Sequence, residues 1–443
     1  MGYGYPLFNF YAPGFYYVAL ALRGLLGLDV WDGYKAVGVL AALVGASGAY
    51  ALTTGVWGKP GLGVLAAVAL LYGPYVFQTN LFQRGDLPEA LALGLLPWLL
   101  LGIWRLHAPL RRREAAMWLA ITVGVGAAIV LVHNLTAIAA VVVAAVWTAG
   151  LVLRAWDRAG ALRIGAAGLA VAGLTAFVWL PALAERGGVQ LEILLEGHMD
   201  YHEWLLDPAG QTPRQQSSEN RQTRSGLVDA HLAYPHQHQF ITTLKPSLAQ
   251  AALGSVALAV VVAGIVSRRT VAPLAALLAL SVACWLLTFR FAEPVWRGVP
   301  GFALLQYPSR LLGPGGVCIA VAGAGALAGP LEWLRGRWGT VSNAALLTAV
   351  LLGVLANGAL AREVPWSDDP RRPVGGQING RTVWIEEGDK FGGTGTTSGG
   401  EFTPRSVEIA VYTAGQRRGR PVFERLYPEA DWLGGLFQPL SGD

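Results

Sequence analysis

Three ionisable side chains stand close together in a chain that is otherwise poor in charge: Arg84, Asp86 and Glu89. Long apolar runs flank them, in a sequence that is 53% hydrophobic and only 14% charged. A charge at a membrane boundary is costly unless it is paired or solvated. Carboxylates can move protons, and arginine can bind an anion through two parallel hydrogen bonds. The stretch is therefore a candidate site, with Asp86 and Glu89 as catalytic residues and Arg84 as a substrate-binding residue.

A plain structural role is the alternative for the same stretch. Asp86 and Glu89 are three residues apart, and Pro88 fits the first turn of a helix. Asp86 can then be the N-cap and Glu89 its capping partner. Both interpretations stay open for Asp86. For Arg84 and Glu89 we favour side chains that line a cavity, because an apolar helix follows directly.

His133 and Asn134 interrupt a long apolar stretch, residues 115–153. A single helix of that length would extend about 58 Å, nearly twice the hydrocarbon core of a bilayer. The stretch must be two spans joined at a turn. Asn134 can cap the returning helix, or both residues can contact a substrate.

Arg310 stands near the start of a late apolar run, in the sequence "QYPSR". Its guanidinium group could bind a phosphate, with Gln306 and Tyr307 beside it. The alternative is that Arg310 extends to the membrane interface. The Tyr-Pro turn favours the binding interpretation.

Two histidines in "GHMDYHEW", His198 and His202, are spaced i, i+4 and could face a metal from one helix. No third ligand is fixed by spacing, so we favour a solvated amphipathic helix. His231, His236 and His238 are read as ordinary loop residues.

Ten apolar runs could position these residues as membrane spans. They cover residues 36–57, 62–81, 87–104, 115–132, 135–153, 164–184, 249–266, 271–289, 311–329 and 343–361. The fold class is therefore an α-helical polytopic membrane protein, located in the cell membrane and surrounded by lipids.

Basic residues fix the orientation, because they are enriched in cytoplasmic loops. Twelve of them fall in one set of loops: Lys59, Arg105, Arg111, Arg112, Arg113, Arg154, Arg158, Arg163, Arg268, Arg269, Arg335 and Arg337. The short loops of the other set hold four. All candidate site residues are then extracytoplasmic, which favours a cavity that opens to that face.

The organisation has three parts. Residues 1–35 are extracytoplasmic, and 14–28 suit a helix in the membrane interface. Residues 36–361 form the transmembrane domain, with an outer loop at 185–248. Residues 362–443 are an extracytoplasmic tail with short β-like runs.

Composition excludes other classes of protein. The net charge of +5 is dispersed without a basic stripe, so we expect no nucleic-acid partner. Cys284 and Cys318 lie in apolar runs and are read as small core residues.

Six motifs resemble a family of bacterial membrane proteins, the 6-pyruvoyl-tetrahydropterin synthase-related domain family. In chain order they are "GYGYPLFNFYAPGFYY", "RGDLPEALALGLLPW", "LVHNLTA", "MDYHEWLLDP", "QYPSRLL" and "GTGTTSGGEFTPR". That family is similar to the C-type glycosyltransferases. The resemblance implies about ten membrane spans and transfer of a sugar from a polyprenyl-phosphate donor on the extracytoplasmic face.

The resemblance leaves the enzyme assignment open. In those transferases the catalytic carboxylate usually lies in the first outer loop, and this chain is expected to begin beyond it; Asp29 and Asp32 do not match that position. Such a transfer needs a carboxylate to take the acceptor proton, and cations to neutralise the phosphate. A divalent metal could supply the latter. A non-catalytic scaffold of the same fold and a lipid or sugar transporter remain alternatives, although no inverted repeat supports the transporter.

Overall fold

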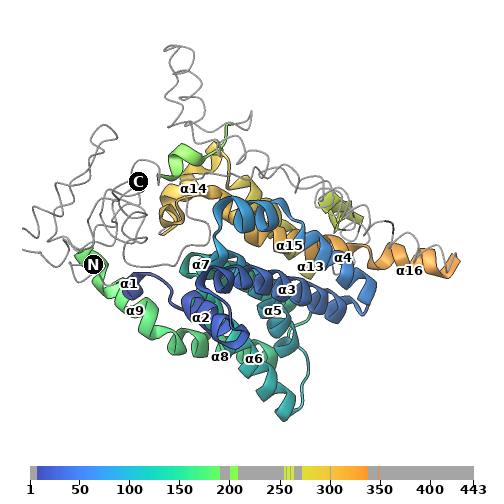
Figure 1. Cartoon of the computed structure of the whole chain (residues 1–443). Coiled ribbons are helices and arrows are strands. Elements are labelled where there is room, and N and C mark those ends of the chain that lie inside the picture. Colours follow the sequence, from blue (N-terminus) through green and yellow to red (C-terminus); the bar gives the residue numbers. More distant parts are fainter. Residues whose placement is uncertain are drawn as a thin grey trace, which may run out of the picture.

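The computed structural model describes residues 7–189, 200–207, 272–299 and 301–337, parts of 254–263, and residue 348 (Figure 1). Within these segments the chain is helical, and its described residues form no strand. One isolated β-bridge joins Leu206 to Phe289.

Five helical segments are long and apolar enough to cross a membrane. They are α3 (Val30–Trp57), α5 (Leu87–His107), α6 (Arg112–Val132), α7 (Asn134–Arg154) and Pro308–Trp333, which includes α15 (Leu312–Ala326). A sixth is formed if α8 (Arg158–Leu174) and α9 (Ala176–Glu185), bent by 63° at Thr175, count as one span. The expectation of a multi-pass helical protein is confirmed at this level.

The expected number of ten spans is matched only in part. Three further apolar helices are shorter: α2 (Gly14–Leu26), α4 (Pro60–Leu71) and α13 (Ala272–Leu286). The expected spans 249–266 and 343–361 lie largely outside the described residues, as does the whole tail 362–443.

Residues 62–81, expected as one span, form two different helices. After α4 ends, a π-helix η1 runs over Pro74–Arg84. Gly73 is extended, and Pro74 has no N–H to continue the α4 ladder. The break leaves an apolar helix of 12 residues and brings the polar end of η1 next to α5.

Helix α5 lies at the centre of the packing, and 72% of its most apolar 18-residue stretch is buried. It packs closely on α3, because a Cβ at Gly94 would stand 2.7 Å from the Ala41 carbonyl oxygen. On the other side, α15 packs against α13 (Figure 1). The cysteines Cys284 and Cys318 are buried and unpaired in this part of the core.

The loops predicted to share the cytoplasmic face lie together. Lys59 Nζ is 2.7 Å from a Glu332 carboxylate oxygen. Arg163 donates hydrogen bonds to the Leu106 and Ala108 carbonyl groups. The candidate residues before Leu87 lie at the opposite end of α5, where η1 and the α6–α7 turn meet.

Candidate functional site

The stretch Arg84–Glu89 forms a tight turn into α5. Gly85 has φ of +61°, a conformation that favours glycine. The Tyr34 hydroxyl donates a hydrogen bond to its carbonyl oxygen. Asp86 accepts from the Glu89 backbone N–H at 3.2 Å and is the N-cap of α5, as the spacing predicted.

Glu89 is buried and neutralises two arginines. Its exposed fraction is 1%. One carboxylate oxygen accepts from Arg84 at 3.0 Å and lies 3.6 Å from Arg310 Nε. The other accepts from the Tyr75 hydroxyl at 2.6 Å. Glu89 therefore fixes the positions of both guanidinium groups, and its side chain does not act as a helix cap.

Arg84 joins the two carboxylates. It donates to Asp86 at 2.7 Å and to Glu89 at 3.0 Å, and also to the Tyr75 hydroxyl at 2.9 Å. Burial alone would raise the pKa of the Asp86 carboxyl group. Burial is the largest single effect, but Arg84, His133, Arg310 and the Glu89 backbone N–H together outweigh it, so the pKa lies below its usual range. Asp86 is consequently ionised at neutral pH.

His133, and not Asn134, caps the returning helix. The Thr136 backbone N–H donates to His133 Nδ1 at 3.2 Å, so this nitrogen is an acceptor. Asn134 instead donates through its amide to the Phe10 carbonyl group at 3.0 Å, which ties the N-terminal segment to the turn. The predicted turn is present, and its cap is His133 where Asn134 was expected.

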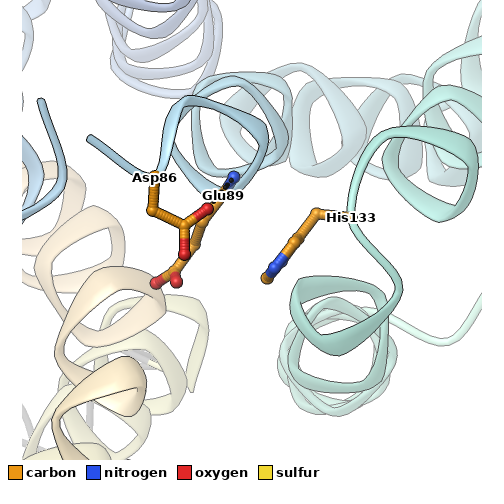
Figure 2. Close-up of side chains that lie close together, drawn as sticks. All are labelled: Asp86, Glu89 and His133. Atoms are coloured by element: carbon orange, nitrogen blue, oxygen red, sulfur yellow. Dashed lines mark hydrogen bonds between the residues drawn. The ribbon is translucent and has the colours of Figure 1, made fainter. Parts of the chain in front are cut away.

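The His133 ring points toward the two carboxylates (Figure 2). Burial lowers its pKa, although Asp86 and Glu89 act in the opposite direction. The imidazole is therefore mainly neutral at pH 7. Since Nδ1 accepts a hydrogen bond, the proton resides on Nε2 and the ring is a donor toward the cavity.

Asp86, Glu89 and His133 bring potential metal-ligand atoms within 4.8 Å of one another. Two features oppose a metal at this point. Both carboxylates already accept from Arg84, and the Nδ1 acceptor leaves His133 without a lone pair on Nε2. The pairing of both carboxylates with Arg84 therefore favours ion pairs over metal ligation in this arrangement.

Arg310 enters the same polar site and does not extend away from it. Its side chain is 13% exposed. One terminal nitrogen donates to the Leu305 carbonyl group at 3.3 Å, while Nε is buried without a hydrogen-bond partner among the described residues. Tyr307 lies beneath both guanidinium groups, with its ring centroid 5.3 Å from Arg310 and 5.9 Å from Arg84.

A cavity of about 1830 Å³ adjoins this polar site. Seven of the eight predicted site residues line it: Arg84, Asp86, His133, Asn134, Gln306, Tyr307 and Arg310. The eighth, Glu89, is buried and pairs with Arg84 and Arg310, which line the cavity. We call Arg84, Asp86, Glu89, His133 and Arg310 the cavity cluster. The structure brings these residues together, and their chemical roles remain predictions.

The rest of the cavity wall is apolar and follows the helices. Along α7 it extends from Asn134 to Val152, a rise of about 27 Å. Small side chains of α8, such as Ala167 and Gly168, form the facing wall. This length is close to the thickness of the hydrocarbon core.

Two residues near the site were not predicted from the sequence. Tyr75 lies in η1 and bonds Glu89, but its spacing from Glu89 predicts nothing. Trp204 lines the cavity; its stretch, "GHMDYHEW", was considered for its histidines and for the family resemblance, and not for its tryptophan.

The predicted helix around His202 is a single 3-10 turn, η5 (Tyr201–Trp204). His202 Nδ1 lies 2.6 Å from Asp200, and Nε2 lies 3.6 Å from Glu293. His198, His231, His236 and His238 lie outside the described residues. We call Asp200, His202, Glu293 and Arg297 the outer cluster.

Comparison with known proteins supplies one match. The model of the 6-pyruvoyl-tetrahydropterin synthase related domain, described as a membrane protein, matches residues 8–200. No curated protein matches the chain. The matched segment includes Arg84, Asp86, Glu89 and His133, whereas Gln306, Tyr307 and Arg310 lie beyond it. The chain is thus a membrane protein that carries a 6-pyruvoyl-tetrahydropterin synthase related domain over residues 8–200.

Proposed function

We propose that this protein binds a polyprenyl-phosphate sugar in the cavity and transfers the sugar on the extracytoplasmic face. One observation carries the proposal. Arg310 is a largely buried guanidinium group whose Nε lies 3.6 Å from Glu89 and makes no hydrogen bond among the described residues, and it lines the cavity where an apolar groove meets a polar site. A buried donor without a partner requires an explanation, and a lipid phosphate supplies one.

The groove explains why the ligand would be a long-chain lipid. Its wall along α7 is apolar over about 27 Å, enough for a tail that stays at bilayer depth. The phosphate would then lie between Arg84 and Arg310, both of which Glu89 holds in place. Guanidinium groups suit this task because they bind phosphate through parallel hydrogen bonds.

Asp86 is the better candidate for the base that accepts a proton. It lines the cavity, whereas Glu89 does not. Its low pKa makes it a weak base, so it would accept a proton only late in the bond-breaking step. We keep Glu89 as a positioning residue in this proposal. Arg84 and Arg310 would supply hydrogen-bond donors to the departing phosphate, while Asp86 and Glu89 balance their charges in the free protein.

The weak basicity of Asp86 favours a second candidate function, a non-catalytic lipid-phosphate-binding protein. Asp86→Asn separates the two. If the protein is an enzyme, this variant binds the donor but transfers little sugar. If the parent binds donor and transfers nothing to any acceptor offered, the binding role is correct.

The phosphate role is tested at Arg310. Arg310→Gln should weaken binding of a radiolabelled polyprenyl-phosphate sugar by about 2–5 kcal/mol, because the buried phosphate loses its partner. Arg310→Lys keeps the charge without the planar fork and should retain part of the affinity. The measurement is donor binding by membranes that contain each variant.

Arg297→Gln is the matched control, since Arg297 is 74% exposed and does not line the cavity. It should bind like the parent. Equal binding by the parent and Arg310→Gln would rule out the phosphate role of Arg310.

A further inference from the structure

An aromatic pair forms part of the cavity wall beside the two arginines. The rings of Trp204 and Tyr307 meet edge to face, with centroids 5.2 Å apart, and both line the cavity. Arg310 and Arg84 lie 5.3 and 5.9 Å from the Tyr307 ring. A group attached to a phosphate held by these arginines would contact the aromatic pair next.

The backbone before Tyr307 is strained. Gln306 has φ of 63° and ψ of −55°, and the Tyr307 N–H bonds the Leu305 carbonyl group at 2.6 Å. This γ-turn with positive φ is rare for a side chain that has a Cβ. Such strain persists only where the surroundings fix the geometry, and it occurs preferentially at functional sites. Here the turn sets the direction of Gln306 and Tyr307 at the cavity.

Trp204 lies far from Tyr307 in the sequence, and the packing of its neighbours also holds it in place. Its neighbour Leu205 is 1% exposed, and Tyr201 stacks on Trp296 with centroids 5.2 Å apart. The Leu206 N–H donates to the Thr288 carbonyl group at 3.0 Å. The two sides of the aromatic pair are therefore joined by a small core, which makes the pair preorganised.

We propose that Trp204 and Tyr307 form a subsite for the sugar ring of the lipid-linked donor, an inference that rests on the proposed function. A pyranose ring presents an apolar face of C–H groups together with hydroxyl groups at its edge. An indole ring offers a large apolar surface to that face, and Gln306, which lines the same cavity, carries an amide of the kind that bonds hydroxyl groups. Tyr307 already contacts both guanidinium groups, so Trp204 supplies the larger contact.

The subsite predicts selectivity for a sugar-bearing lipid over the bare lipid phosphate. The probes are undecaprenyl phosphate and the same lipid phosphate carrying one glucose, compared by competition in detergent micelles. The parent should bind the glucose-bearing probe about three- to tenfold more tightly, the range expected for one aromatic contact. Trp204→Leu should bring this ratio to about one, and Trp204→Phe should retain part of it.

Trp179→Leu is the matched control, because Trp179 also lines the cavity but lies in α9. It should keep the ratio of the parent. Each ratio is measured within one variant, so a smaller fraction of folded protein does not change it.

The outcomes separate the two proposals. If the parent binds neither probe, the proposed function is wrong. If the parent binds both probes equally, or Trp204→Leu weakens both equally, the sugar subsite is wrong and the phosphate site stands.

Discussion

The cavity cluster and the outer cluster are built from the same residue types, carboxylates with arginine and histidine, and differ in burial. In the cavity cluster the side chain of Glu89 is 2% exposed and that of Arg84 is 15% exposed. In the outer cluster His202 is 44% exposed and Arg297 is 74% exposed. Exposed ion pairs contribute about 0–1 kcal/mol, whereas removing one partner of a buried pair costs several.

The difference shows what each cluster can do. Water satisfies the outer cluster, so its ion pairs can join two loop segments without further consequence. In the cavity cluster each charge depends on its neighbours, and Arg310 has a donor that the described residues leave unused. A ligand at the cavity would therefore change the energy of the buried cluster much more than that of the exposed one.

The largest expected effect is on stability. Glu89→Gln leaves Arg84 and Arg310 without their shared counter-ion and should lower the free energy of unfolding by about 3–5 kcal/mol. Arg297→Gln in the outer cluster should lower it by less than about 1 kcal/mol. Unfolding by SDS in mixed micelles measures both. Similar losses in the two variants would mean that burial does not distinguish the clusters.

The second-largest expected effect is on lipid binding, and it concerns the apolar wall of the cavity, which the outer cluster lacks. Ala144 lines the cavity in the middle of α7. Ala144→Phe should weaken binding of a polyprenyl phosphate by at least about tenfold, since each buried CH₂ of a tail contributes about 0.8 kcal/mol. Binding of a short-chain alkyl phosphate, measured by competition, should change little.

Val142→Phe is the control for this variant, because Val142 is exposed on the same helix and does not line the cavity. It should leave binding of both lipids unchanged. A tail that bound equally well to Ala144→Phe would have to lie outside the groove.

Backbone strain is a smaller difference between the two regions. Among the described residues Gln306 alone has a positive φ without being glycine, and it belongs to the cavity wall. Gln306→Gly should raise the free energy of unfolding by about 1 kcal/mol, because relief of strain exceeds the entropic cost of glycine. Gln306→Ala keeps the strain and loses the amide, so it should be less stable than Gln306→Gly in the same SDS titration. The reverse order would show that the turn is not strained.

Much of this arrangement was accessible from sequence because it follows from local rules. The capping of α5 by Asp86 could be predicted from two residues three positions apart, Asp86 and Glu89. The length of the apolar stretch 115–153 alone requires a turn, and His133 lies where it occurs. Polar residues at the predicted outer ends of spans converge because helix ends share a face of the membrane. The sequence patterns were most informative where a single helix or turn was sufficient to explain them.

Tertiary contacts decided the rest. No local rule states that Tyr75 bonds Glu89, or that Trp204 reaches Tyr307 from a distant loop. The only sign of the break at Gly73 in the sequence is Pro74, which follows it within an apolar run. Hydropathy alone predicts that this run is one continuous span. Glu89 was expected to line the cavity, but it is buried and pairs with the two arginines that do line it.

The smallest expected effect comes from the protonation of His133. Its pKa is lowered by burial, so between that value and about 6.5 the unfolded chain binds a proton that the folded protein does not. Stability therefore falls as pH decreases through this window, with a slope of at most about 1.4 kcal/mol per pH unit from this group. Above pH 6.5 the contribution of His133 is constant.

His133→Gln removes that group and should flatten the slope in SDS titrations between pH 5.5 and 7.5, whereas His202→Gln in the outer cluster should leave the contribution of His133 in place. The charged groups that face His133 are Asp86, Glu89, Arg84 and Arg310. A slope that His133→Gln left unchanged would mean that the imidazole is solvated and charged like an exposed one. The cavity would then be wetter at its polar end than the burial of the cluster implies, and a lipid phosphate there would gain less from Arg310.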